Sequence, residues 1–451
     1  MSCVLEIIGA TKPEWQEATD EMMATDKLSD LLLLAYHFAK VLARNLVEEI
    51  LHKKGQLPQE WPTCPDCGRK VESKGRKSRQ LETRLGVIQW KRSVGRCPNR
   101  CKIGQKAPLD TKLGLAPNQK TERYLQQISV LLAVFVPFET ASMLLAQLLG
   151  IQVSPTSIWN WVQQYGKVCM EQLEAELAQL MRGELPEPEK VDTELQNLLL
   201  LIGADGVMVP FRPHNRSSKG RTQWREVKIG ILARLQQYRT RSGSLATRLK
   251  HHRVVAVLGN IDDLGLRLRL EAYKQAIWLA PKVVWISDGA KGFWRLYHDY
   301  FQDYAIGILD FYHASQNLWQ ALKVWLDGRT LGARLFYRLS RSRLRLGRAD
   351  VVLADIQNAL QLNGLPANAK HSLTKVYNYL YTHRDHIDYD LFKQSGCPIG
   401  SGFVESTCKW LIQQRFKGVG MRWSEDGFNH LLHLRLAWVN NRFDDLFFLP
   451  P

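Results

Sequence analysis

Four cysteines in this sequence have the spacing of a metal site. Cys64 and Cys67 form one close pair, and Cys97 and Cys101 form a second pair about thirty residues later. Four thiolates grouped in this way can surround one zinc ion tetrahedrally, with two ligands from each knuckle of a ribbon. The alternative is that the four cysteines are unrelated. The spacing favours a structural zinc site.

Three acids are candidates for a second site. Asp205 lies inside a strongly apolar stretch, Asp288 ends the apolar run "KVVWIS", and Glu405 follows "GSG" at an expected helix start. Each has an ordinary alternative. Both aspartates precede a glycine, which makes a common turn pair. Glu405 stands four residues before Lys409, the spacing of a surface ion pair on a helix.

Taken together, the three acids indicate metal-dependent chemistry. Functional groups collect where strands end in open α/β sheets, and a charge in an apolar strand is costly unless it is paired or bound to metal. Converging carboxylates suit Mg²⁺, or Mn²⁺ in its place. Two such ions about 4 Å apart can activate an attacking oxygen and stabilise a leaving one in phosphoryl transfer.

The elements that would position these acids begin near residue 196. Three apolar stretches, "NLLLLIGADGVMVPFR", "EVKIGILARL" and "RVVAVLG", predict strands, and "DDLGLRLRLEAYKQAIWL" predicts a helix. "KVVWIS" predicts a fourth strand, and "YAIGILDFYHASQNLWQALKVWL" a fifth that runs into a helix. The pattern is that of an α/β sheet of mixed direction. Residues 321–395 are expected to be helical and include seven arginines, with no acid, between 329 and 348.

The N-terminal part is expected to be helical around the cysteine segment. Residues 27–54 predict one amphipathic helix, used either for packing or for dimerisation. Residues 138–166 predict two helices joined at Gly150, with Ser154 capping the second. This layout suits a DNA-binding helix-turn-helix, although a helical hairpin of the core would look the same. Residues 171–195 hold eight acids and two bases, which predicts a linker.

The charge of the chain points to a polyanionic partner. Lys and Arg number 61 against 44 Asp and Glu, a net charge of +17, and nucleic acid is the natural candidate. Thirteen Lys or Arg stand against three acids between residues 64 and 106, so the expected ribbon either meets phosphates or carries a solvated basic face. No secretion signal and no bilayer-spanning apolar run is visible. We therefore expect a cytoplasmic protein with no membrane partner.

The order of these motifs resembles that of a known family. Asp205, then "SDGAKGFW" with Asp288, "ILDFYHA", and "GSGFVES" with Glu405 resemble DDE transposases with an RNase H-like catalytic domain. With the "CPDCG" ribbon upstream and "GSGFVESTCKWLIQQRFKGVGMRWS" downstream, the chain is similar to bacterial insertion-sequence transposases of the ISKra family, relatives of the Mutator-like group. The similarity extends from about Cys64 to Trp438.

The resemblance implies roles for individual residues. Asp205, Asp288 and Glu405 match the catalytic triad that holds two divalent ions. An all-helical insertion fills the interval of 117 positions between the last two (405 − 288 = 117) in the relatives. Asp310 and His313 of "DFYH" match an Asp/Cys-x-x-His motif and are expected to support the site. For His313, a helix-capping or core role is the alternative.

The resemblance also implies a reaction and its partners. Water would cleave DNA strands at the terminal inverted repeats of a transposon, and the 3′-hydroxyl ends would then attack target DNA. Holding two ends requires at least a dimer, and the bound protein would be associated with the nucleoid. Two alternatives stay open: a catalytically silent DNA-binding protein derived from a transposase, and an RNase H-like nuclease that does not join strands.

The expected fold class is a multidomain α+β and α/β chain. It would combine a zinc ribbon and a helical DNA-binding region with an RNase H-like mixed-sheet domain that carries an all-helical insertion. The expected segments are an N-terminal helical region, 1–60; the zinc ribbon, 61–107; a helix-turn-helix-like region, 108–170; an acidic linker, 171–195; the first part of the catalytic core, 196–320; the insertion, 321–395; and the last part of the core, with the glutamate, 396–451.

Overall fold

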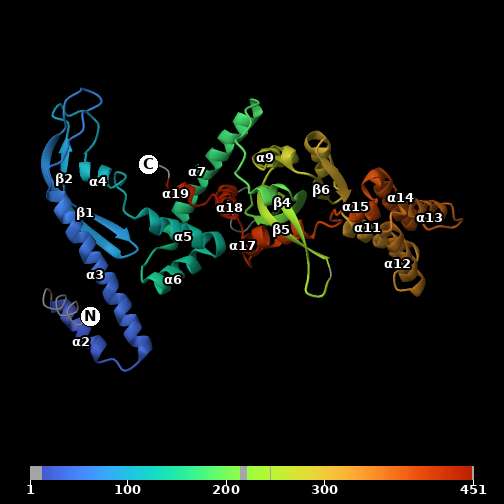
Figure 1. Ribbon diagram of the computed structural model, residues 1–451, viewed down its shortest axis with the longest axis horizontal. Coiled ribbons are helices and arrows are strands. Elements are labelled where there is room, and N and C mark those ends of the chain that lie inside the picture. The colour runs from blue at the N-terminus through green and yellow to red at the C-terminus, as the bar shows by residue number, and fades with distance from the viewer. Residues whose placement is uncertain (1–12, 214–220, 244, 449–451) are drawn as a thin grey trace. The chain divides into compact units, whose positions relative to one another are not determined.

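The computed structural model describes residues 13–213, 221–243 and 245–448. The chain divides into two compact units, residues 1–161 with 447–451 and residues 162–446, so the boundary falls inside helix α7, Pro155–Met181 (Figure 1). Within the described ranges, no helix is both long enough and apolar enough to cross a membrane.

The first unit is built on a long helix and a hairpin. Helix α3 is the one predicted over residues 27–54, and strands β1 and β2 pair antiparallel around a turn at Gly86, whose φ is 100°. Apolar side chains from α3, the hairpin and α4 form its small core. The helices and strands of this part before α7 are α2, Pro13–Met23; α3, Leu28–Gln56; β1, Glu72–Thr83; β2, Gly86–Arg96; α4, Pro108–Lys112; α5, Arg123–Phe135; and α6, Phe138–Leu149.

The predicted helical pair is present, but its second helix is longer than expected. Gly150 ends α6 in the left-handed conformation (φ 62°), as glycine does at many helix ends. Ser154 accepts a hydrogen bond from the Ser157 N–H at 3.1 Å and caps α7 as predicted. Helix α7 then continues to Met181. The linker predicted over 171–195 is therefore wrong for its first part, where regularly spaced leucines continue the helix.

The second unit contains a five-stranded sheet of mixed direction, with the order β5-β4-β3-β6-β7. Neighbours among β3, β4 and β5 pair antiparallel, whereas β6 runs parallel to β3 and β7 parallel to β6. All five predicted strands are confirmed. They are β3, Leu199–Phe211; β4, Gln223–Arg239; β5, Leu245–Val257; β6, Val283–Ser287; and β7, Ala305–Leu309.

Helices surround this sheet, and the stretch 321–395 is helical as predicted. The first group comprises α8, Thr193–Gln196; α9, Ile261–Lys274; the short helix η1, Ile277–Leu279; α10, Lys291–Leu296; η2, Tyr297–Phe301; and α11, Phe311–Trp325. The insertion comprises α12, Leu331–Arg345; α13, Ala349–Leu360; α14, Ala367–Thr382; η3, Arg384–His386; and α15, Tyr389–Gln394. The last group is α16, Gly402–Thr407; η4, Cys408–Gln413; α17, Gln414–Phe416; α18, Glu425–Val439; and α19, Asp445–Phe448.

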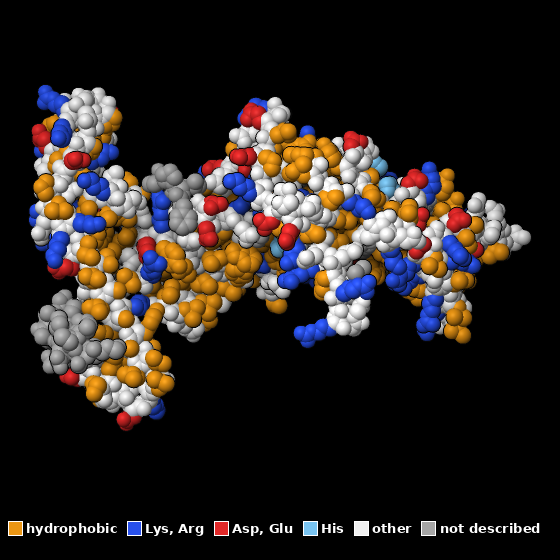
Figure 2. All heavy atoms as spheres, viewed as in Figure 1, with side chains coloured by type: hydrophobic (Ala, Val, Ile, Leu, Met, Phe, Trp, Pro, Cys, Tyr) orange, Lys and Arg blue, Asp and Glu red, His pale blue; other side chains and the backbone are white. Residues whose placement is uncertain are grey.

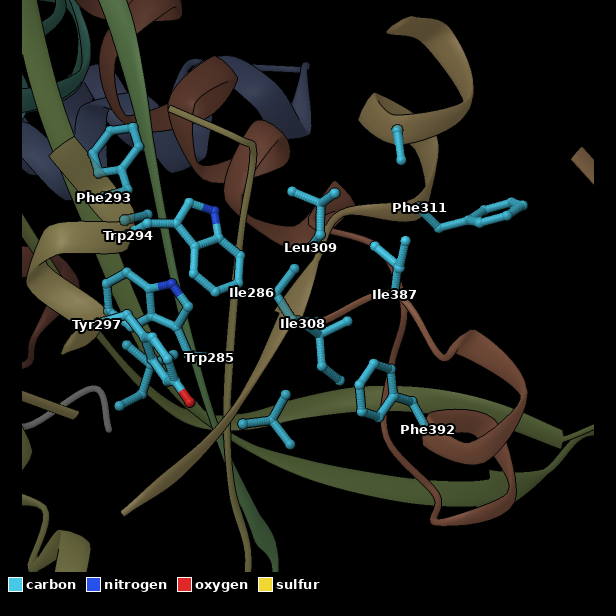
Figure 3. Packing of buried hydrophobic residues seen from close by; sticks show 14 of the residues in the cluster. Trp285, Ile286, Phe293, Trp294, Tyr297, Ile308, Leu309, Phe311, Ile387 and Phe392 are labelled. Carbon is cyan, nitrogen blue, oxygen red and sulfur yellow. The ribbon is translucent and has the colours of Figure 1, made fainter. Parts of the chain in front are cut away.

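The sheet and the insertion share one continuous hydrophobic core. Trp285 of β6 is fully buried and stacks on Phe301 with ring centres 5.3 Å apart. Figure 3 shows this part of the core, in which residues of β6 and β7 lie with Ile387 and Phe392 from the end of the insertion. Burial of this many large side chains fixes the ends of β6 and β7 in place.

Candidate active site

Three aspartates follow directly after the last parallel-paired residues of β3, β6 and β7. Ala204 pairs with Ser287, and Ser287 pairs with Leu309. The next residue on each strand is an aspartate, namely Asp205, Asp288 and Asp310. Their order across the sheet follows β3, β6 and β7. The ladder continues one step further, because the Asp310 N–H donates to the Ser287 carbonyl at 2.9 Å.

The strand register also decides between a turn and a strand at Asp205. Asp205 and Gly206 face Ile229 and Lys228 of β4, and the pairing continues to Phe211. The alternative of an Asp-Gly turn is therefore wrong at this position. The carboxylate belongs to a central strand, which explains why it is partly buried.

Helix α16 brings Glu405 to the same place by packing on β3. A Cβ atom added at Gly203 would lie 2.5 Å from Val404 Cγ2 and 2.6 Å from Phe403 Cζ. Side chains alternate along a strand, so Gly203 shares its face of the sheet with Asp205. The missing side chain at Gly203 thus lets α16 rest on β3 and places Glu405 within electrostatic range of Asp205.

The carboxylates keep acceptor capacity for a ligand. Asp205 Oδ1 accepts the Gly206 N–H at 2.7 Å, and Asp288 Oδ1 accepts the Ala290 N–H at 3.0 Å. The ion pair expected between Glu405 and Lys409 has an Oε2–Nζ distance of 4.0 Å, too long for a hydrogen bond. The site therefore presents several carboxylate oxygens with unused lone pairs.

The charges in this site repel one another. Burial raises the pKa of Asp205, and the negative charges of Asp288 and Glu405 raise it further, while Gly206 and His313 act in the opposite direction. A group of hard oxygen donors whose negative charges repel one another is the donor set that divalent cations such as Mg²⁺ prefer. The residues present fit such an ion.

Asp310 is held differently from the other two aspartates. Its Oδ1 accepts the His313 N–H at 2.7 Å, which caps α11, and its Oδ2 accepts the Ser401 N–H just before α16. Burial by itself would raise the pKa of Asp310, but the hydrogen bonds from His313 and Ser401 outweigh burial and lower it to about 2. Asp310 is therefore a buried anion that ties β7 to the segment leading into Glu405.

His313 is the positive counterpart of this group. Its Nδ1 lies 3.4 Å from Asp310 Oδ1, and the pKa of the imidazole is raised to about 9 by that partner, with further contributions from Asp288 and Asp205. The ring is therefore protonated at neutral pH. The backbone N–H of His313 is the group that Asp310 caps at the start of α11. The helix-capping alternative therefore applies to the backbone of His313, whereas its side chain is the positively charged partner of Asp310.

Three residues of this arrangement were not singled out from the sequence: Gly203, Ser401 and Tyr379. A glycine inside a strand signals close approach of another element, which could have drawn attention to Gly203. Tyr379 of α14 is different, because a Cβ atom at Gly289 would lie 1.9 Å from its Cε2. Burial raises the pKa of Tyr379, with contributions from Asp288 and Asp310. Nothing local in the sequence links it to the aspartates.

The four cysteines of the first unit come together as their spacing predicts. All four are free, and their Sγ atoms lie within 4.8 Å of one another, with Cys67 and Cys97 3.4 Å apart. Tetrahedral zinc with bonds of about 2.3 Å places sulfur atoms about 3.8 Å apart. The group can therefore bind one metal ion.

The arginine-rich segment forms α12 and the residues on either side of it. Figure 2 shows Lys and Arg side chains gathered over the region of α12. Two of the seven arginines have acidic partners: Arg329 Nη2 lies 2.9 Å from Asp327, and Arg343 pairs with Asp355. The segment therefore has fewer free cations than the sequence suggests.

No family model and no curated protein matches this chain. Among solved structures, a chain of the "Drosophila P element transposase strand transfer complex" is similar over 74% of this chain and 96% of that chain, with 10% identity and a TM-score of 0.33. A likeness this weak carries no argument about function, which has to rest on the residues of this chain.

Proposed function

We propose that this protein is a DNA transposase whose second unit contains an RNase H-like catalytic domain. The observation that carries the proposal is the strand register: Asp205 and Asp288 directly follow the paired residues Ala204 of β3 and Ser287 of β6, and Glu405 lies within electrostatic range of Asp205. The sheet order is β5-β4-β3-β6-β7, and β3, β6 and β7 run parallel while β4 runs antiparallel to β3, which agrees with the mixed-direction sheet expected with the RNase H-like resemblance. The resemblance of the motifs to DDE transposases then supplies the reaction.

In this proposal the three carboxylates hold two Mg²⁺ or Mn²⁺ ions. When bound, such ions supply Lewis-acid stabilisation of the attacking and leaving oxygens of a phosphodiester. The protein positions the carboxylates through the register of β3 and β6 and through the contact of α16 with Gly203. Asp310 and His313 position the start of α11 and the segment before α16, and do not hold the metal.

The other parts of the chain serve DNA binding in this proposal. The cysteine group holds a structural zinc ion, and the ribbon and the helical pair α6–α7 recognise the terminal inverted repeats. The basic residues of the insertion contact the DNA backbone, since neutralising phosphates supplies most of the affinity of DNA-binding proteins. Two copies would hold two ends and join them to target DNA in the cytoplasm of a bacterium, in association with the nucleoid.

A cleavage assay on labelled DNA from the ends flanking the coding region tests this function. Wild type is expected to nick the end DNA only with Mg²⁺ or Mn²⁺, whereas Asp288→Asn binds it without cutting. Binding without cutting by wild type under every metal condition would favour the silent DNA-binding protein instead.

The same assay separates transposition from simple cleavage. A target plasmid is added, and labelled ends joined to it are expected with wild type. Cut ends that never join would favour an RNase H-like nuclease that lacks strand transfer.

A further inference from the structure

A basic and aromatic cavity lies between helices α11 and α12, outside the group of carboxylates. Its volume is about 630 Å³, which is within the usual range for small-molecule sites. The side chains that matter for its chemistry are Tyr312, Ser315 and Trp319 from α11 and Arg338, Arg341 and Arg345 from α12.

The arginines of this cavity favour an anion. Their spacing of three and four residues puts them on one face of α12. No carboxylate among the described residues forms an ion pair with any of them, in contrast to Arg343 on the same helix, which pairs with Asp355. Arg341 also lies over the ring of Phe311, 5.0 Å from its centre. Three guanidinium groups on one wall suit a phosphate.

The opposite wall offers surfaces for a planar group. Tyr312 is 60% exposed, and Trp319 packs against Tyr337 with ring centres 5.1 Å apart. Ser315 is 3% exposed, and its hydroxyl has no hydrogen-bond partner within the described part of the chain. A buried hydroxyl without a partner is costly unless a ligand satisfies it. Rings together with hydrogen-bonding groups suit a nucleobase.

The cavity is adjacent to the carboxylate site. Tyr312 follows Asp310 by two residues, and its ring lies against Gly400, where an added Cβ atom would be 2.6 Å from Tyr312 Cε2 and 3.9 Å from Asp310 Oδ2. Tyr312 therefore lies directly beside the carboxylate site.

We propose that this cavity binds one unpaired nucleotide of the DNA strand next to the reacting phosphodiester. Arg338, Arg341 and Arg345 hold a phosphate of that nucleotide, and its base stacks on Tyr312. A paired base inside a duplex has no free face to offer, so the site selects DNA that is single-stranded at this point. The inference rests on the proposed function, because it assumes that the strand at the carboxylates is DNA.

A binding experiment with the full chain tests this proposal. The probes are a labelled DNA duplex that carries a single-stranded tail and the same duplex with blunt ends. Wild type is expected to bind the tailed duplex more tightly. Tyr312→Ala weakens binding of the tailed duplex about tenfold, because it removes the ring on which one base stacks. Binding of the blunt duplex does not change, and Tyr312→Phe, which keeps the ring, behaves as wild type.

An arginine pair gives a second, matched test. Arg345→Ala removes an exposed guanidinium of the cavity and lowers the preference for the tailed duplex. Arg334→Ala, on the same helix but outside the cavity, weakens binding of both probes by the same factor and leaves the preference unchanged. This pair also carries the test if Tyr312→Ala does not fold. No preference in wild type, or a preference that neither Tyr312→Ala nor Arg345→Ala lowers, would overturn the proposal.

The two proposals fail in different ways. If the preference for the tailed duplex depends on Tyr312 but the protein never cuts DNA, the nucleotide site is supported and the catalytic function is contradicted. If the protein cuts DNA in a metal-dependent way but its preference for the tailed duplex does not depend on Tyr312 or Arg345, the catalytic function is supported and the nucleotide site is contradicted.

Discussion

The side chain of Val404 packs directly against the backbone of Gly203. There is no room between them for a methyl group, since a Cβ atom at Gly203 would lie 2.5 Å from Val404 Cγ2. This contact fixes the height of α16 above β3, two residues before Asp205. The position of Glu405 relative to Asp205 therefore depends on a glycine that carries no functional group.

Substitution of Gly203 is expected to move Glu405 away from Asp205. Gly203→Ala has to displace α16 by a fraction of an ångström or more, which costs about 1–3 kcal/mol of stability and lowers cleavage by a larger factor than it lowers DNA binding. Gly402→Ala is the control in the same helix, because its Cβ atom meets nothing within 4 Å. Thermal unfolding and cleavage rates of both variants are the measurements. Equal activity in the two variants would contradict the assigned role of Gly203.

Divalent cations are expected to stabilise the protein in the absence of DNA. Repulsion among Asp205, Asp288 and Glu405 is relieved when a cation binds them, so Ca²⁺ at saturating concentration raises the unfolding temperature by about 2–4 °C. Asp205→Asn removes most of this rise. Asp303→Asn, just before the opposite end of β7, leaves it intact. A rise of the same size in Asp205→Asn would show that the cations bind elsewhere.

His313 is expected to make stability fall in mildly alkaline solution. Its pKa is raised from 6.5 to about 9 in the folded chain, so protonation stabilises the fold below pH 6.5 and this contribution is lost as the pH rises through 9. The shift corresponds to at most about 3 kcal/mol. Urea unfolding between pH 6 and pH 10 should show this loss in wild type and a flatter profile in His313→Gln. Parallel profiles would contradict the raised pKa.

The cysteine group is expected to hold about one zinc ion per chain. Metal analysis of the purified protein should find it, and the double variant Cys97→Ser with Cys101→Ser should lose it, since two thiolates alone bind zinc weakly. Cys169→Ser, outside the group, is the control and retains the metal. Unchanged zinc content in the double variant would contradict the claim that these cysteines bind the zinc ion.

Much of the second unit could be predicted because its signals are local. Apolar runs gave the five strands, and Asp288 was found because it ends one of them. The glycine at 203 could have signalled a close approach, but its partner Val404 could not be predicted, and neither could the contact of Tyr379 with Gly289. Each contact joins segments far apart in the chain. The end of α7 was missed for a different reason: acidic residues suggested a linker where leucines at helical spacing continue the helix to Met181.

The central claim is that Asp288 holds a metal ion that acts on DNA, and replacing the ligand atom tests it most directly. A thiolate suits softer ions than Mg²⁺, so Asp288→Cys is expected to lose cleavage of end DNA at least about a hundredfold in Mg²⁺ and to regain much of it in Mn²⁺. Asp310→Cys, which alters a positioning residue, should show no such rescue. Cleavage by Asp288→Cys in Mg²⁺ at the wild-type rate would contradict the account.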